Sequence, residues 1–348
     1  MSWKDYLRDV EPYVAGEQPK MANLIKLNTN ENPYGPSPKV EAALKMLRSE
    51  KLRLYPDADA SGLKKALADL HHLKPEQIFI GNGSDEVLAL SFLTFFNSEK
   101  PLLFPDITYS FYPVYTRLFD IPYKSIPLND RFEIVLEDYK QENGGIIFPN
   151  PNAPTGILVS VDFIEELLQA NPNSMVIIDE AYIDFGGESC VPLLEHYDNL
   201  LIIQTFSKSR SLAGLRIGVA YGNRDAIKAL QNVKNSFNSY PVDYIAQHLA
   251  TASVLDHEDM LYKAKKVITA REYTIKELRQ LGFEVLESKT NFVFARHPQL
   301  EAEKLLADLR AAGIIVRHFN QPRIDQFLRI SIGTITQMEE LIKFLKEY

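Results

Sequence analysis

A single lysine follows an apolar run near the middle of the chain. Residues 200–203 predict a buried strand, and Lys208 lies just beyond it, next to Ser207, in the segment TFSKSRSLAGLRIG. A desolvated ammonium is costly, and a lysine in its neutral amine form can make a Schiff base with a carbonyl compound. Arg216 lies eight residues further along, with hydroxyl side chains between, and this set suits a phosphate group. The alternative from these residues alone is a solvated lysine and an arginine in an ion pair.

A glycine loop, GNGSDE, follows a short predicted strand at 77–80 and leads into a helix. Backbone N–H groups at the start of a helix bind phosphate well, so Gly83, Ser84 and Asp85 are candidates for such contacts. The segment lacks the third glycine of a dinucleotide fingerprint and the lysine of a P-loop. Ser84 as an ordinary helix cap is the alternative.

Three further residues come directly after predicted strands. Asp179 follows the four apolar residues 175–178, so it needs a cationic partner or a hydrogen-bonded ligand. A structural pair between this aspartate and an arginine is the alternative. The other two residues are Tyr109, after the strand at 101–105, and Asn152, in the turn NPNAPTG after the strand at 146–149.

Strands and helices alternate from residue 77 to about residue 230, which predicts parallel pairing and an α/β sandwich. In such sheets the ligand lies at the carboxyl ends of the strands. Convergence at one edge of the sheet favours a ligand site over separate structural roles, and the residues predicted to meet there are Ser84, Tyr109, Asn152, Asp179 and Lys208.

The remaining segments suggest an arm and a second domain. Residues 1–30 form an N-terminal arm, and the asparagine-rich segment at 27–38 is either a connection or the lining of a site. A large domain is predicted at 31–245 and a small α+β domain at 246–348. In the small domain a long amphipathic stretch at 262–281 comes first, then strands at 283–286, 292–296, 314–317 and 327–332 and helices at 299–311 and 335–347.

The composition is that of an ordinary globular protein, with 348 residues, 45% apolar and 24% charged. The net charge is -8, and without a basic run of five or more residues we expect no nucleic-acid partner. No apolar run approaches about 18 residues, and the N-terminus is too polar for a signal peptide. The single cysteine, Cys190, excludes internal disulfides, and no zinc motif is present. We therefore expect a cytoplasmic protein without a metal or a membrane partner.

The sequence resembles the fold-type I aminotransferases, which use pyridoxal phosphate, over nearly its whole length. The segments that carry the resemblance are NPNAPTG, DEAYIDF, TFSKSRSLAGLRIG and LRISIGT. Within that superfamily, PYVAGE, LNTNENPYGPS, RLYPD and GNGSDE are similar to the histidinol-phosphate aminotransferase family. One departure is Ala153, where the family more often has asparagine or histidine. The resemblance implies a large domain with a mostly parallel seven-stranded sheet between helices, a smaller C-terminal α+β domain and an N-terminal arm.

The resemblance also implies a role for each candidate residue. Lys208 would hold the cofactor as a Schiff base and then move protons as general base and acid. Asp179 would pair with the protonated pyridine nitrogen. Asn152 and Tyr182 would hydrogen-bond the ring oxygen, and Tyr109 would stack on the ring. The cofactor phosphate would be held by Gly83, Ser84, Asp85, Ser207 and Arg216, with Tyr55 reaching across from the second subunit of a homodimer.

Substrate binding is implied at two arginines of the small domain. Arg329 would bind the carboxylate of glutamate or 2-oxoglutarate in a bidentate manner. Arg317 and Tyr13 would bind the phosphate of histidinol phosphate, and Arg323 is an alternative to Arg317. Asn152 would also contact the substrate. The implied reaction, in histidine biosynthesis, transfers an amino group between L-histidinol phosphate and 2-oxoglutarate, which gives imidazole acetol phosphate and L-glutamate.

Three alternative functions stay open from the sequence. An aromatic amino acid aminotransferase shares this scaffold. A decarboxylase of a phosphorylated amino acid uses the same lysine. A binding or regulatory module would hold the cofactor or a nucleotide without turnover, but the chain carries no additional DNA-binding segment to support it. Cys190 has no assigned role and is most simply a small apolar residue.

Overall fold

The computed structural model describes residues 1–14, 16–20 and 24–348. Its largest element is a seven-stranded sheet with the strand order β2-β8-β7-β6-β5-β3-β4. β8 runs antiparallel to both of its neighbours, and every other pair is parallel, which confirms the mostly parallel sheet predicted above. The strands are β2 (Ile78–Asn82), β3 (Leu102–Pro105), β4 (Tyr123–Ile126), β5 (Gly145–Pro149), β6 (Val176–Asp179), β7 (Leu200–Thr205) and β8 (Ile217–Gly222).

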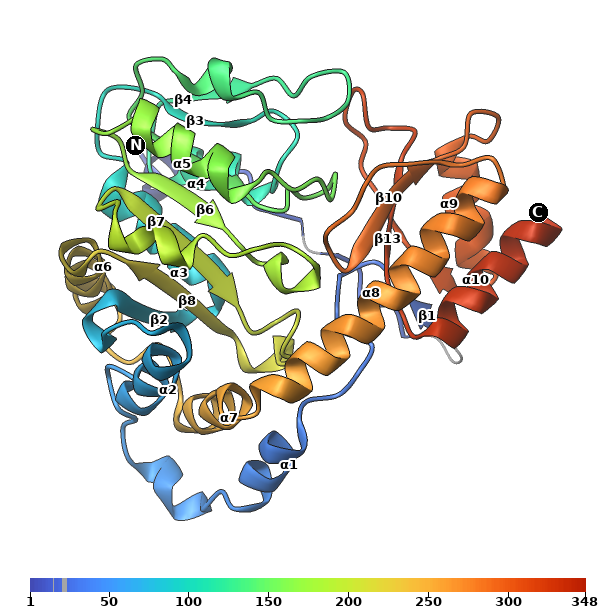
Figure 1. The fold of residues 1–348 in the computed structure, drawn as a ribbon. Coiled ribbons are helices and arrows are strands. Elements are labelled where there is room, and N and C mark those ends of the chain that lie inside the picture. The colour runs from blue at the N-terminus through green and yellow to red at the C-terminus, as the bar shows by residue number, and fades with distance from the viewer. Residues whose placement is uncertain (15, 21–23) are drawn as a thin grey trace.

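Helices cover both faces of this sheet (Figure 1). Successive side chains of a strand point to opposite faces, and in β5 Ile146 and Phe148 pack into one core while Ile147 packs into the other. Both faces are therefore apolar, as a parallel sheet between two helical layers requires. The first core includes α2 (Ser61–His71), α5 (Val161–Ala170) and α7 (Tyr244–Val254); the second includes α3 (Gly83–Phe95), α4 (Phe111–Leu118) and α6 (Arg224–Phe237).

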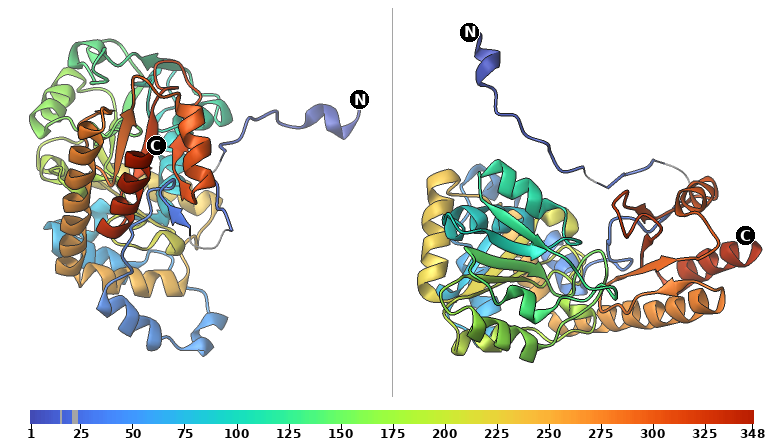
Figure 2. Two further views of the ribbon diagram at one scale, coloured as in Figure 1. Left: turned by 90° about the vertical axis from the view of Figure 1, so that its right-hand side faces the viewer. Right: turned by 90° about the horizontal axis from the view of Figure 1, so that it is seen from above.

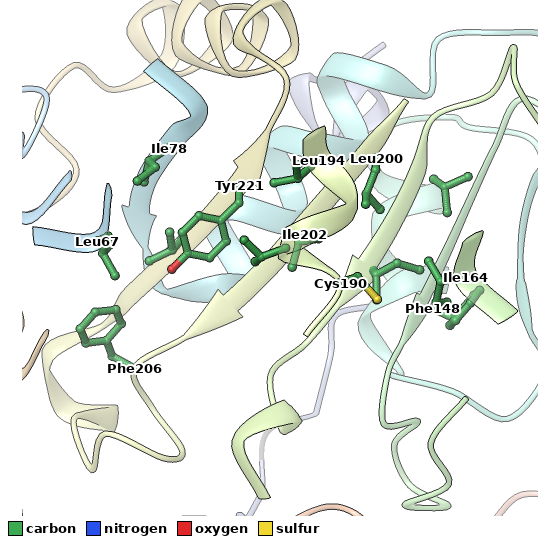
Figure 3. Close-up of a cluster of buried hydrophobic side chains, with 14 of the residues drawn as sticks. Leu67, Ile78, Phe148, Ile164, Cys190, Leu194, Leu200, Ile202, Phe206 and Tyr221 are labelled. Atoms are coloured by element: carbon green, nitrogen blue, oxygen red, sulfur yellow. The ribbon is translucent and has the colours of Figure 1, made fainter. Parts of the chain in front are cut away.

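Cys190 belongs to the first of these cores (Figure 3). Its side chain is fully buried beside strand residues such as Phe148 and Ile202, and burial raises the pKa of its thiol well above the ordinary value. This environment agrees with the interpretation of Cys190 as a small apolar residue.

A second, smaller sheet lies beyond the long helix α8 (His257–Gln280), which extends from the neighbourhood of α7 to this sheet (Figure 1). The sheet has four antiparallel strands in the order β12-β13-β10-β9. The division into an arm at 1–30, a large domain at 31–245 and a small domain at 246–348 remains a prediction. The elements of this region are β9 (Glu284–Val285), β10 (Phe292–Arg296), α9 (Ala302–Ala311), β12 (Arg317–His318), β13 (Leu328–Ser331) and α10 (Ile335–Glu347).

The N-terminal segment joins this smaller region before the chain enters the large sheet. β1 (Ile25–Lys26) pairs in parallel with β11 (Ile314–Ile315), and α1 (Pro38–Lys45) begins at the predicted cap Ser37. The first residues project from the rest of the molecule (Figure 2). Among the described residues no helix is both long and apolar enough to cross a membrane. Short 3₁₀ helices occupy Trp3–Tyr6, Ser49–Arg53, Pro75–Gln77, Leu136–Tyr139, Ile183–Phe185, Val191–Glu195 and Ala213–Leu215.

Candidate active site

A cavity of about 220 Å³ lies where the carboxyl ends of β6 and β7 meet the N-terminal segment and the smaller sheet. Three separate parts of the chain therefore contribute to one site. Of the residues predicted from the sequence, the cavity is lined by Tyr13, Ser84, Asp85, Tyr109, Asp179, Tyr182, Ser207, Lys208, Arg216, Arg317 and Arg329.

Lys208 reaches the cavity from the turn after β7. Its Nζ donates one long hydrogen bond, 3.3 Å, to the carbonyl oxygen of Thr29, and lies 5.8 Å from the centre of the Tyr182 ring. The side chain of Asn32 holds the turn by donating to the carbonyl oxygen of Lys208 at 3.0 Å. Among the described residues the amine has no carboxylate within ion-pair distance. It is thus a weakly held amine at the wall of the cavity.

Asp179 ends β6 and is 4% exposed. One carboxylate oxygen accepts a hydrogen bond from the Tyr112 hydroxyl at 3.2 Å, and the other accepts from the Ala181 N–H at 3.2 Å. Burial raises the pKa of Asp179 from 3.8 to about 7, although both of these donors act to lower it. The pair with an arginine that was the structural alternative is absent among the described residues. The site therefore offers a buried carboxyl group that a cationic ligand would stabilise as the carboxylate.

Arg216 also lines the cavity. Its Nη2 pairs with an oxygen of Asp85 at 3.1 Å, and the other oxygen of Asp85 accepts from the Tyr109 hydroxyl at 2.9 Å. Because a carboxylate repels a phosphate, Asp85 is suited to orient Arg216 and Tyr109 rather than to bind an anion itself.

The glycine loop packs tightly beneath this guanidinium. Gly83 has a φ of +80°, and a Cβ there would lie 2.5 Å from Nη2 of Arg216. A Cβ on Gly218 of β8 would lie 2.4 Å from the carbonyl carbon of Gly83. Only glycine fits at either position. Two hydroxyl groups lie beside the loop, those of Thr205 and Ser207, 3.0 Å apart.

Two arginines enter from the smaller sheet. Arg317 of β12 lies directly opposite Arg329 of β13, and both line the cavity. Nη2 of Arg329 donates to the carbonyl oxygen of Asn28 at 3.2 Å, while its buried Nε has no partner among the described residues. Burial lowers the pKa of Arg329. Neither guanidinium pairs with a carboxylate of the described chain, so this wall can receive anionic groups.

Four of the other candidates lie outside the lining. Gly83 lies beneath it, as described above. Asn152 is buried, and its amide donates to the carbonyl oxygen of Ile107 and to the Thr155 hydroxyl, both at 3.0 Å. Arg323 instead donates to the carbonyl oxygen of Asn129 at 2.7 Å. Tyr55 is 84% exposed and stacks on Tyr240.

The structure also adds residues that no sequence argument had named. Four of them belong to the asparagine-rich segment and line the cavity: Asn28, Thr29, Asn30 and Glu31. The composition of this segment indicated either a connection or the lining of a site, but it did not show which residues would face a ligand. Tyr112, the donor to Asp179, was missed because an aromatic residue in a helix is ordinarily a core residue.

Comparisons with known proteins agree with this arrangement. A family model described as aminotransferase class I and II matches residues 22–345. The chain is 59% identical over 348 residues to the histidinol-phosphate aminotransferase of Lactococcus lactis subsp. cremoris (strain MG1363), covering 100% of this chain and 98% of the relative. The histidinol-phosphate aminotransferase of Pseudomonas syringae pv. syringae (strain B728a) is 54% identical over 345 residues and covers 99% of each chain.

Among solved structures, the histidinol-phosphate aminotransferase from Clostridium acetobutylicum aligns with a TM-score of 0.86 at 25% identity, over 93% of this chain and 98% of that one. The family model covers nearly the whole chain and the relatives match it over almost their full length, so this chain belongs to the class I and II aminotransferase family.

Proposed function

We propose that this chain transfers an amino group between L-histidinol phosphate and 2-oxoglutarate, giving imidazole acetol phosphate and L-glutamate, with pyridoxal phosphate as the cofactor. The observation that carries the proposal is the single cavity in which Lys208 shares the walls with a buried Asp179 and with two guanidinium groups, Arg317 and Arg329. Two relatives named histidinol-phosphate aminotransferase, 54% and 59% identical to this chain, support the choice of substrate.

The cavity fits pyridoxal phosphate by its charges. Asp179 is a buried carboxyl group without a cationic partner among the described residues, and a protonated pyridine nitrogen would supply one. Arg216, with the hydroxyl group of Ser207 and the backbone at Ser84, offers donors for a phosphate group. Tyr182 would hydrogen-bond the ring oxygen and Tyr109 would contact the ring.

When bound, the cofactor supplies an aldehyde that takes up the amino group and a ring that withdraws electrons from the reacting carbon. Lys208 would hold the cofactor and, once released as a free amine, would take a proton from the substrate carbon that carries the nitrogen and pass it to the former aldehyde carbon of the cofactor. Asp179 would keep the pyridine nitrogen protonated, and the positive charge of that nitrogen would keep Asp179 ionised. The donors Tyr112 and the Ala181 N–H favour that ionised form.

The two substrates carry different anionic groups, a carboxylate and a phosphate, and the smaller sheet supplies an arginine for each. Arg329 would hold a carboxylate of glutamate or 2-oxoglutarate, and its unpartnered Nε leaves a donor for that contact. Arg317 and Tyr13 would hold the phosphate of histidinol phosphate. We favour Arg317 over Arg323 because Arg317 lines the cavity, whereas Arg323 is engaged with Asp106 and Asn129 outside it.

The enzyme would act as a homodimer in the cytoplasm. Tyr55 and Tyr240 form a stacked, exposed pair, and other apolar side chains nearby in the sequence are also exposed, among them Met46 and Phe237. A second copy would cover them, and Tyr55 would then reach the partner's cofactor phosphate. The single buried cysteine suits a reducing compartment.

A half-reaction screen tests this function. The holoenzyme is mixed separately with histidinol phosphate, phenylalanine, tyrosine and threonine phosphate, and the absorbance of the bound cofactor is followed. We expect histidinol phosphate to convert the cofactor to its amine form most rapidly and 2-oxoglutarate to reverse the change.

The other outcomes identify the alternatives. Faster conversion by phenylalanine or tyrosine would identify an aromatic aminotransferase, and carbon dioxide release from threonine phosphate would identify a decarboxylase. If the protein binds pyridoxal phosphate but no donor converts it to the amine form, the protein would be a binding module without turnover. Lys208→Ala is the control, because it should abolish conversion by every donor; a variant that still transaminates would contradict the role of this lysine.

A further inference from the structure

Asn30 touches Tyr182 from the wall of the cavity. It is 1% exposed and has a φ of +56°, a conformation that asparagine tolerates better than most residues. Its Nδ2 lies 3.0 Å from the Tyr182 hydroxyl oxygen. Asn291 donates to its carbonyl oxygen at 2.9 Å, and its N–H donates to the Ser331 hydroxyl at 2.9 Å. The residue is thus fixed at its backbone and at its side chain.

These contacts determine which way the amide of Asn30 points. The hydroxyl oxygen of Ser331 accepts from the Asn30 N–H, and its single proton is donated to Oδ1 of Asn30 at 2.8 Å. Oδ1 can only accept, so the NH₂ group must face Tyr182. The opposite orientation would leave the proton of Ser331 without an acceptor, because Asn30 supplies the only partners of that hydroxyl among the described residues.

The Tyr182 hydroxyl is the acceptor in its contact with Asn30. An NH₂ group can only donate, so the Tyr182 oxygen accepts from Asn30 and its own proton must point elsewhere. Tyr182 lines the cavity, and within the described chain its hydroxyl has no second partner. The proton of Tyr182 is therefore available to a group inside the cavity.

We infer that Asn30 is a positioning residue that makes the Tyr182 hydroxyl a hydrogen-bond donor to the ring oxygen of the bound cofactor. The inference rests on the proposed function, because it takes the occupant of the cavity to be pyridoxal phosphate. Ser331 acts one step further away by holding the amide in its orientation. Asn30 itself does not need to touch the cofactor or the substrate for this role.

The test uses two replacements of Asn30 and a background that lacks the tyrosine hydroxyl. Asn30→Asp keeps the shape but places an acceptor where the donor was, so that Tyr182 would donate to the new carboxylate. Asn30→Gly suits the positive φ, keeps both backbone hydrogen bonds and removes the side chain. Each is made alone and combined with Tyr182→Phe. Asn143→Asp is the matched control, since Asn143 is a buried asparagine whose amide bonds Asn171, remote from the cavity lining.

Two quantities are measured with pyridoxal phosphate alone, without substrate. One is its dissociation constant, and the other is the pH midpoint at which the absorbance of the bound cofactor changes. We expect each Asn30 variant to weaken binding about ten-fold, the effect of one hydrogen bond to a charged group, and to move the midpoint in the direction given by Tyr182→Phe. In the Tyr182→Phe background we expect the same replacements to change either quantity less than two-fold.

A purely structural role would give a different pattern. Equal losses with and without the Tyr182 hydroxyl, or a midpoint that stays at the wild-type value in both Asn30 variants, would overturn the inference. The inference would also be overturned if Asn143→Asp changed the dissociation constant and the pH midpoint as much as the Asn30 variants do. These failures are separate from those of the proposed function, because an enzyme that converts histidinol phosphate normally can still show no coupling between Asn30 and Tyr182.

Discussion

The hydroxyl of Tyr112 donates a 3.2 Å hydrogen bond to the carboxylate of Asp179, and both residues are buried. The contact favours the ionised form of a carboxyl group whose burial favours the protonated form. It therefore supports the charge that a pyridinium ligand requires. Burial, together with the charge of Asp179 and this hydrogen bond, raises the pKa of the Tyr112 hydroxyl well above its ordinary value, so that the tyrosine stays a donor at all ordinary pH values.

Tyr112→Phe tests this contact. We expect the variant to bind pyridoxal phosphate about five- to ten-fold more weakly, because loss of a hydrogen bond costs roughly 1 kcal/mol, measured by titration of the cofactor-free protein. Tyr139→Phe is the matched control. The Tyr139 hydroxyl is buried without a partner in the described chain, so its removal should leave cofactor binding unchanged and leave stability unchanged or higher. Equal cofactor affinities in the two variants would contradict the role of Tyr112.

Asp179→Asn should change how the stability of the cofactor-free protein depends on pH. The native pKa of Asp179, about 7, lies above its ordinary value of 3.8, so this group favours the folded state most at low pH and loses that contribution as the pH rises to about 7. Asparagine has no such dependence. Between pH 5 and pH 8 the stability of the variant relative to the wild type should rise by about 2–3 kcal/mol, while its cofactor affinity falls.

The measurement is urea denaturation of both proteins at the two pH values. Glu180 is also buried, with a pKa raised to about 7, but it is present in both proteins and cancels in the comparison. A stability difference that does not change with pH would show that Asp179 is already ionised in the cofactor-free protein.

The two arginines of the smaller sheet should separate the two substrates. Arg329→Gln should raise the KM for glutamate by at least about ten-fold, as expected when a charge-assisted hydrogen bond is lost, and should affect histidinol phosphate less. Arg317→Gln should show the opposite preference. Arg323→Gln is the control, because Arg323 lies outside the cavity lining. Steady-state kinetics with each amino donor tests this, and a larger effect on histidinol phosphate from Arg323→Gln than from Arg317→Gln would move the phosphate site.

Gly218→Ala should displace the glycine loop at Gly83 and Ser84, where we propose that the cofactor phosphate binds. The new Cβ would lie within 2.5 Å of the backbone of Gly83 and Ser84, so the loop must move, at a cost of about 1–3 kcal/mol in stability. We expect pyridoxal phosphate to bind at least about ten-fold more weakly. Gly62→Ala, in α2 with open space around the new Cβ, should instead raise stability by about 0.5–1 kcal/mol. Denaturation and cofactor titration check both, and unchanged affinity in Gly218→Ala would be the contrary result.

Much of the fold could be predicted because most strands of the large sheet contain an unbroken run of apolar residues. Residues 175–178 and 200–203 have no other stable place than the centre of a sheet covered on both faces, and the polar residues after them had to meet at one edge. The strand β4 was missed because three of its four residues are exposed, so the apolar pattern is absent.

The parts of the site that come from the N-terminal segment could not be predicted residue by residue. Nothing in the local sequence distinguishes Asn30, which touches Tyr182, from Asn32, which caps the lysine turn. Their roles depend on contacts with distant strands. The proposed roles of Tyr13 and Arg317 come only from the resemblance, because a half-buried tyrosine in an arm and a half-buried arginine in a short strand carry no signal of their own.

The contact between Asn30 and Ser331 joins residues 301 positions apart. Closing so long a loop is entropically costly and is delayed until the surrounding structure supports it. During synthesis the large sheet can pair its strands, all of which lie before residue 223, while residue 331 has yet to be made. The wall of the cavity that contains Thr29 and Asn30 therefore cannot be fixed by this contact until residue 331 has been made, and a nascent chain with Lys208 already in place after β7 would still lack a closed site.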